Sequence, residues 1–448
     1  MTRPTVTMHG VDAGDSYYFW QWVHDPSSEP QAHVMPRADL APLLHRLDES
    51  LPGSTGTETF TTGLFTRYAT EFVFSRALSR VALPRALAAQ IVEKFNEHGG
   101  PVLLRVQPSP SCSRIPWELL TIGDDADPKR LVDYADIVID PPPDINSGRA
   151  AEPAEWEPEY AAAPALYVVD PFTDRVQGPV LSAAQREAFP MHSPVRDNPE
   201  PGKEFGRLQL SEQLRTRPSR LFYLGHVASS SSQPGASALL LSDPPWTFGV
   251  TDVIEGNGHA IRPLSAFDLI EGTWRAPLRL PAILERAAAG EKPGSMLWPG
   301  GKRGSRALGA AIWPMPARVA LVACNSGGDL AHPEPFGLVI AMLNAGAGLV
   351  TATRWTLPTD DALHRSVPEA RHAQPLFDMA LAIDDAHRQA DPVPVIAEWQ
   401  RVRLAAWKAS RGAQEHSPVF WASLSTYLAP RNPPEPIPAD ELKRLLEG

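Results

Sequence analysis

Residues 317–355 limit the possible folds more than any other stretch of this chain. The stretch begins with Val319–Ala323, an unbroken apolar run of the kind that parallel sheets bury on both faces. A cysteine and a glycine-rich turn follow, then the apolar helical segment Phe336–Ala345 and a second apolar run, Leu349–Thr353. Strand, turn, helix and strand make one right-handed βαβ unit. The sequence therefore predicts an α/β fold with a mostly parallel sheet flanked by helices.

Two chemically active side chains follow strands of this predicted sheet. Cys324 comes directly after the run Val319–Ala323, and His226 ends a second apolar strand that starts at Leu221. Open α/β sheets place their chemistry at the carboxyl ends of the strands. If the two strands are neighbours, a thiolate nucleophile and an imidazole base lie at one edge. The alternative for Cys324 is a buried thiol that acts as a small hydrophobe.

Composition narrows the classes of function. The net charge of −11 argues against a general nucleic-acid binder. Only two cysteines occur, Cys112 and Cys324, which excludes a disulfide framework and fits a reducing compartment. We expect Cys112, in a serine- and proline-rich turn, to be structural. No run of 18 apolar residues exists, and residues 1–10 lack a signal-peptide core, so we expect a cytoplasmic protein without a membrane span.

The length of 448 residues predicts two or three domain-sized units. Residues 1–145 form an N-terminal strand and helix region, with a hairpin around Asp12–Asp15, and residues 146–164 form a proline-rich linker. Residues 165–430 form the domain that carries His226 and Cys324. Residues 246–313 are an insertion in it with one convincing helix, Leu280–Ala289, and residues 431–448 are a tail with a polar helix. We interpret Trp117 as a core residue and Glu118 as the partner of an arginine.

Seven short motifs occur in order between about residue 90 and about residue 430. They are Ile115–Leu120 (IPWELL), Leu181–Ala188, Leu221–His226, Ala238–Leu241, Val322–Gly327, Gly337–Trp355 and Pro418–Ala422. Together they resemble the motifs of CHAT-domain proteins. These are a bacterial branch of the caspase-like cysteine peptidases, the group that also holds separases, metacaspases and gingipains. The resemblance implies a caspase-like sheet with a pseudo-caspase-like or α+β N-terminal region packed against it.

The resemblance implies a cysteine peptidase with a His–Cys dyad. Cys324 would be the nucleophile, and His226 the general base and acid. The backbone N–H groups of Cys324 and Val227 would form the oxyanion hole. Family members mostly have glycine where this chain has Val227, and glycine alone readily adopts positive φ. No metal or organic cofactor is needed for this chemistry.

Two carboxylates are candidates for recognising a basic P1 residue, Asp170 after the strand 165–169 and Asp329 after the nucleophile turn. Asp243 is a remoter option, and without a carboxylate in the pocket the P1 preference becomes small or apolar. The resemblance implies a specific protein substrate in a bacterial defence or cell-death module. Gasdermin-like pore formers are one substrate class, and an activating sensor protein is a further partner. The alternatives are a catalytically inactive caspase-like scaffold and an acyl transferase that uses the same dyad.

Overall fold

The computed structural model describes residues 3–23, 25, 28–51, 58–123, 125, 127–142, 151–173, 176–228, 237–249, 251–272, 306–324 and 335–429. The expected helices Leu280–Ala289 and 440–447, the tail 431–448 and residues 146–150 of the predicted linker lie outside these residues.

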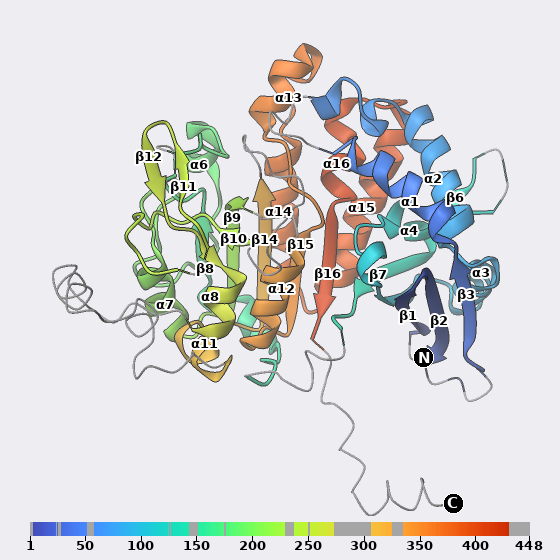
Figure 1. Cartoon of the computed structure of the whole chain (residues 1–448), viewed down its shortest axis with the longest axis horizontal. Coiled ribbons are helices and arrows are strands. Elements are labelled where there is room, and N and C mark those ends of the chain that lie inside the picture. The colour runs from blue at the N-terminus through green and yellow to red at the C-terminus, as the bar shows by residue number, and fades with distance from the viewer. Residues whose placement is uncertain are drawn as a thin grey trace, which may run out of the picture.

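A single mixed, mostly parallel sheet of 12 strands runs through the described part of the chain (Figure 1). In spatial order its strands are β13 (Leu264–Ser265), β10 (Ala238–Leu239), β9 (Arg220–Ala228), β14 (Arg318–Cys324), β15 (Leu349–Thr353), β16 (Leu424–Leu428), β7 (Ala135–Ile139), β4 (Val102–Gln107), β1 (Thr5–Ala13), β2 (Asp15–Val23) and β3 (Gln31–Met35), and β8 (Leu166–Val169) pairs with β9. Two small antiparallel pairs stand apart, β5 (Thr121–Ile122) with β6 (Lys129–Arg130) and β11 (Ile254–Gly256) with β12 (His259–Ile261). The predicted α/β class is confirmed.

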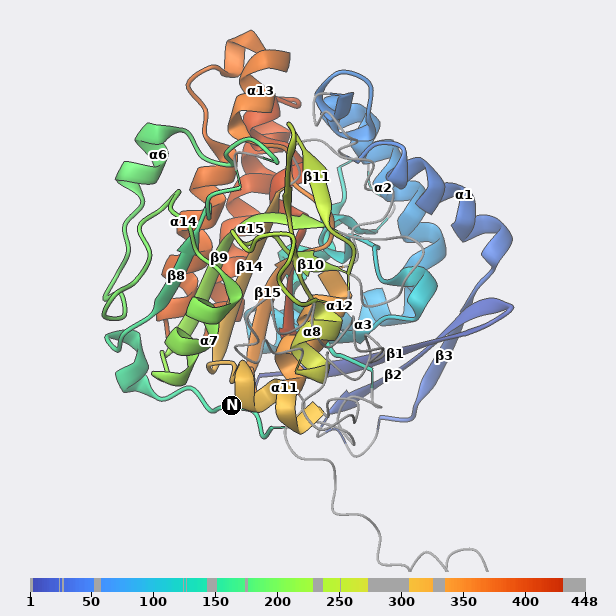
Figure 2. The same ribbon diagram turned by 60° about the vertical axis from the view of Figure 1, so that its left-hand side comes forward.

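Helices cover both faces of the sheet. They are α1 (Arg37–Asp48), α2 (Tyr68–Ala82), α3 (Arg85–His98), α4 (Leu131–Tyr134), α6 (Ala183–Ala188), α7 (Arg207–Arg215), α8 (Ala266–Glu271), α11 (Arg306–Ile312), α12 (Pro335–Asn344), α13 (Asp360–Ser366), α14 (Pro375–Arg388), α15 (Pro392–Ala409) and α16 (Pro418–Trp421). Helices α14 and α15 lie on one side of the sheet, and α12, α8 and α11 on the other (Figure 2). Pro84 separates α2 from α3 as expected, because proline removes a helical hydrogen bond.

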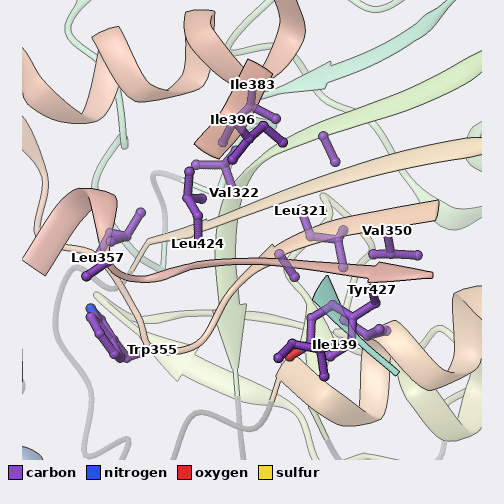
Figure 3. Packing of buried hydrophobic residues seen from close by; sticks show 14 of the residues in the cluster. Ile139, Leu321, Val322, Val350, Trp355, Leu357, Ile383, Ile396, Leu424 and Tyr427 are labelled. Atoms are coloured by element: carbon purple, nitrogen blue, oxygen red, sulfur yellow. The ribbon is translucent and has the colours of Figure 1, made fainter. Parts of the chain in front are cut away.

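The main core lies between the central strands and these helices. Figure 3 shows Ile383 of α14 and Ile396 of α15 pointing toward Val322 of β14, and all three side chains are buried. The strand burial is continuous rather than alternating: every residue of β15 is buried. Strands covered on both faces are apolar throughout, which is why the apolar runs near residue 320 and residue 350 identified them.

The two halves of the chain share the sheet edge to edge. Strand β16, from the C-terminal half, pairs in parallel with β7, from the N-terminal half, through Tyr427 and Ile139. Beside this joint, Glu118 accepts two hydrogen bonds from Arg354, at 2.5 and 2.8 Å, and both side chains are buried. Trp117 is fully buried. The expected roles of Trp117 in the core and Glu118 as an arginine partner are confirmed.

Candidate functional site

The sheet brings the backbones of His226 and Cys324 side by side. Strands β9 and β14 are parallel neighbours, and their register runs from Arg220 beside Arg318 to His226 beside Cys324. Cys324 is the last residue of β14, so the pair lies at the carboxyl edge of the sheet. The expectation that these two strands are neighbours is confirmed. For Cys324 the structure describes the backbone alone.

The imidazole of His226 is held in one tautomer. The residue is 2% exposed, and its Nε2 lies 2.7 Å from the carbonyl oxygen of Gly178. A carbonyl only accepts hydrogen bonds, so Nε2 must carry the proton and donate it. In the neutral ring Nδ1 is then the basic nitrogen, the atom that a general base uses.

Asp170 anchors the segment that supplies this carbonyl. Its carboxylate accepts hydrogen bonds from the backbone N–H of Val180, at 2.8 Å, and of Leu181, at 3.1 Å. Burial raises the pKa of Asp170, while those two N–H groups, the neighbouring His226 and Arg186 work against the rise. The carboxylate and the imidazole therefore hold the same short segment, 178–181, from two sides.

The end of β9 is fixed by a contact along the strand. The hydroxyl of Tyr223 lies 2.6 Å from the carbonyl oxygen of His226 and 3.1 Å from that of Leu240. Its ring crosses Gly225, where an added Cβ would lie 2.7 Å from the Tyr223 oxygen and 3.2 Å from Pro171 Cδ. Glycine before the histidine is thus required by packing, because no larger residue fits beneath the ring.

Val227 continues the strand in extended conformation. It pairs with Leu239 of antiparallel β10, and the Leu240 N–H donates to the His226 carbonyl. With this hydrogen bond, Val227 and Leu239 form a non-hydrogen-bonded pair of the antiparallel ladder, in which both N–H groups point away from the partner strand. The Val227 N–H therefore points away from β10, toward the side where β14 lies. The positive φ that glycine would permit is not adopted at Val227.

The remaining candidate residues have different surroundings. Asp329 and the rest of the turn 325–334 lie outside the described residues. Asp243 accepts a hydrogen bond from the Arg207 backbone and faces the Arg207 guanidinium at 3.7 Å, which gives this carboxylate a structural role. Cys112 is a free, fully buried thiol.

Sequence reasoning did not find Gly178. Its contribution is a backbone carbonyl, which has no side-chain signature. The signal in the sequence was indirect: the motif that starts at Leu181 begins three residues after Gly178.

In the part of the chain that the structure describes, His, Cys, Asp and Glu side chains never gather in groups of three or more that could hold a metal ion. Every helix in the described part is too short or too polar to cross a membrane.

No family model matches the chain, and a search of curated proteins finds no match.

Proposed function

We propose that this protein is a cysteine endopeptidase that uses a His226–Cys324 dyad to cleave a specific protein partner. The observation that carries the proposal is the register of β9 and β14, which pairs His226 with Cys324 at the carboxyl edge of the sheet. The fixed tautomer of His226 adds support, since it leaves Nδ1 as the nitrogen that accepts a proton.

The reaction is acyl transfer in two steps. The His226 imidazole takes the thiol proton, and the Cys324 sulfur attacks the scissile carbonyl carbon. His226 returns that proton to the amide nitrogen as the C–N bond breaks, which leaves a thioester and a free amine. Water then attacks the thioester, with His226 again accepting the proton, and the acid product and the thiol are released. Backbone N–H groups of Cys324 and Val227 stabilise the oxyanion in both steps.

The substrate side of the proposal rests on the resemblance to CHAT-domain proteins. On this resemblance we propose a bacterial defence or cell-death module, with a gasdermin-like pore former as one substrate class and a sensor protein as activator; the proposed cytoplasmic location rests on the composition. A basic P1 residue would meet Asp170 or Asp329. In the structure both oxygens of Asp170 already accept backbone hydrogen bonds, so P1 recognition would use the remaining lone pairs of that carboxylate.

Alkylation of the two cysteines tests the dyad. An ordinary thiol of pKa about 8.5 is only about 1% ionised at pH 6.5, whereas a thiol beside an imidazolium is largely ionised. We expect iodoacetamide to modify Cys324 at least about tenfold faster than an ordinary thiol at pH 6.5. Intact-mass measurement resolves this because fully buried Cys112 is the only other cysteine. An acyloxymethyl ketone with a P1 arginine should label Cys324 faster than its P1 norleucine counterpart.

Two controls separate the enzyme from an inactive scaffold. His226→Ala should remove the rate advantage at pH 6.5, whereas His372→Ala, at an exposed histidine, should keep it. Cys112→Ala should label as wild type, and Cys324→Ala should not label. If Cys324 reacts as an ordinary thiol and His226→Ala changes nothing, the dyad does not exist and the scaffold is the better description.

A further inference from the structure

A surface pocket lies beside the sheet edge that carries the proposed dyad. It has a volume of about 930 Å³, within the range of ligand-binding pockets. Four chain segments line it: the loop after β8 with Phe172 and Thr173, the segment before α7 with Glu204, the segment after β10 with Trp246, and the hairpin β11–β12. We call it the hairpin pocket. Figure 2 shows the β11–β12 hairpin in front of β9, β10 and β14.

The described lining of the hairpin pocket is aromatic and acidic. Glu204 and Glu255 line it together with Phe172 and Trp246; the described lining contains neither lysine nor arginine, and its one basic side chain is His259. Both glutamates are exposed, and neither makes an ion pair with the described part of the chain. Trp246 is 67% exposed, an unusual state for the largest apolar side chain. Exposed tryptophan beside carboxylates is the chemistry that binds a guanidinium or ammonium group.

The two glutamates stand on fixed backbone. The residues on either side of Glu204 are anchored: the Lys203 carbonyl accepts from Phe172 N–H at 2.9 Å, and Phe205 N–H donates to Ser242 Oγ at 3.0 Å. Glu255 is the middle residue of β11 and pairs with Ala260 of β12. The backbone that carries both carboxylates is therefore fixed before any ligand arrives, which lowers the entropic cost of binding.

Trp246 also stands on a defined turn. The Thr247 N–H donates to the Pro244 carbonyl at 2.9 Å, and the Arg262 guanidinium donates to the Pro245 carbonyl at 3.2 Å. Two consecutive prolines before the tryptophan further restrict the backbone. Thr173, at the opposite wall, is 2% exposed, and its hydroxyl makes no hydrogen bond with the described residues.

The hairpin pocket adjoins the segment that orients His226. The N–H groups of Val176 and Gln177 donate to the Thr173 carbonyl, and Gly178, the acceptor for His226, follows directly. Gly256 of the hairpin packs so closely that an added Cβ would lie 2.4 Å from the Val176 oxygen. A chain that occupies the pocket would thus lie beside the proposed reaction edge.

We infer that the hairpin pocket binds an arginine or lysine side chain from a basic segment of the protein substrate, at a site separate from the P1 residue. The cation would stack on Trp246 and form charge-assisted hydrogen bonds to Glu204 and Glu255. This inference rests on the proposed peptidase function for the identity of the partner. The charge complementarity of the pocket supports it independently.

Binding of a small peptide probe tests the inference without catalysis. The probe is a dye-labelled Ala-Ala-Arg-Arg-Ala-Ala peptide, compared with its citrulline counterpart of equal shape and no charge. Fluorescence anisotropy with the full-length Cys324→Ala protein measures both affinities. We expect the citrulline peptide to bind about tenfold more weakly. The Glu204→Gln/Glu255→Gln variant and the Trp246→Ala variant should each weaken arginine-peptide binding by a similar factor.

The matched control is Glu157→Gln/Glu159→Gln, which removes two exposed charges elsewhere on the chain. This control has the same net charge as Glu204→Gln/Glu255→Gln, and it should bind the arginine peptide as tightly as the parent protein does. Equal losses of arginine-peptide affinity in the two double variants would mean diffuse attraction to an acidic protein and would overturn the inference. Equal affinity for the arginine and citrulline peptides, or no binding of the arginine peptide, would overturn it as well. Specific binding combined with an inert Cys324 would retain the pocket and reject the peptidase.

Discussion

At the scale of single residues, the orientation of His226 depends on a carboxylate that holds the segment presenting its hydrogen-bond acceptor. Asp170 holds the Val180 and Leu181 N–H groups, and the same segment presents the Gly178 carbonyl to His226. In Asp170→Asn the amide oxygen can accept from only one of these two N–H groups. The NH2 group of the amide is itself a donor and cannot bind the other. The backbone itself tolerates the change, because Asp170 has φ of 48° and asparagine adopts this region readily.

We therefore expect Asp170→Asn to slow the alkylation of Cys324 by iodoacetamide about ten- to a hundredfold at pH 6.5. Iodoacetamide has no P1 side chain, so the loss would measure positioning of His226 and not substrate recognition. Asp197→Asn is the matched control, at an exposed aspartate with φ of 61°. If Asp170→Asn alkylates as fast as wild type but discriminates less against a P1 norleucine ketone, Asp170 is a P1 residue alone.

The sequence predicted the two residues of the proposed dyad but not the contacts that support them. His226 and Cys324 were found because each follows an apolar strand, and strand ends of a parallel sheet meet at one edge. The oxygen of Gly178 and the hydroxyl contact of Tyr223 depend on the path of loops, which short-range patterns do not encode. The hairpin pocket was missed for the same reason.

At the scale of elements, long strands and helices were predictable and short strands were not. Strands β14 and β15 follow the apolar runs Val319–Ala323 and Leu349–Thr353. The amphipathic stretches 374–390 and 395–410 predict helices α14 and α15 within a few residues of their observed bounds. Strands β11, β12 and β13 contain two or three residues each, too few for a repeating pattern. We expected a loop-rich segment there.

Gly225 tests how tightly β9 is packed at its reactive end. Gly225→Ala would place a methyl group 2.7 Å from the Tyr223 oxygen, inside a buried and hydrogen-bonded ring contact. We expect this overpacking to lower the free energy of unfolding by about 1–3 kcal/mol and to slow Cys324 alkylation, since the displaced Tyr223 releases the His226 carbonyl. Urea unfolding and the alkylation rate measure the two effects.

Gly100→Ala is the comparison for Gly225→Ala, because an added Cβ at Gly100 meets nothing within 4 Å. It should leave the alkylation rate at the wild-type value and change stability by less than about 1 kcal/mol. Wild-type stability in Gly225→Ala would show that the Tyr223 ring is free to move, against the packing described above.

At the scale of the whole molecule, the shared sheet predicts that both halves unfold together. The direct strand pairing between them is a single bridge, Tyr427 with Ile139. Buried polar contacts reinforce it: Glu118 with Arg354, and Glu71 with Trp407 of the C-terminal half. From the prolines of residues 146–164 the sequence predicts a linker between two regions. Proline content reports the stiffness of the local chain, so it could not predict that strands on either side of this segment pair in one sheet.

Glu118→Gln tests this coupling. Arg354 is 1% exposed at its side chain and would lose its charged partner while staying buried. Removal of one member of a buried ion pair costs about 3–5 kcal/mol, whereas an exposed pair contributes less than about 1 kcal/mol. Asp361→Asn, in the exposed pair of Asp361 with Arg365, is therefore the control. Urea unfolding by tryptophan fluorescence and by circular dichroism should give one coincident transition, shifted to lower urea in Glu118→Gln alone. Two separate transitions, with only the first sensitive to Glu118→Gln, would mean that the C-terminal half folds independently and that the ion pair does not unite the sheet.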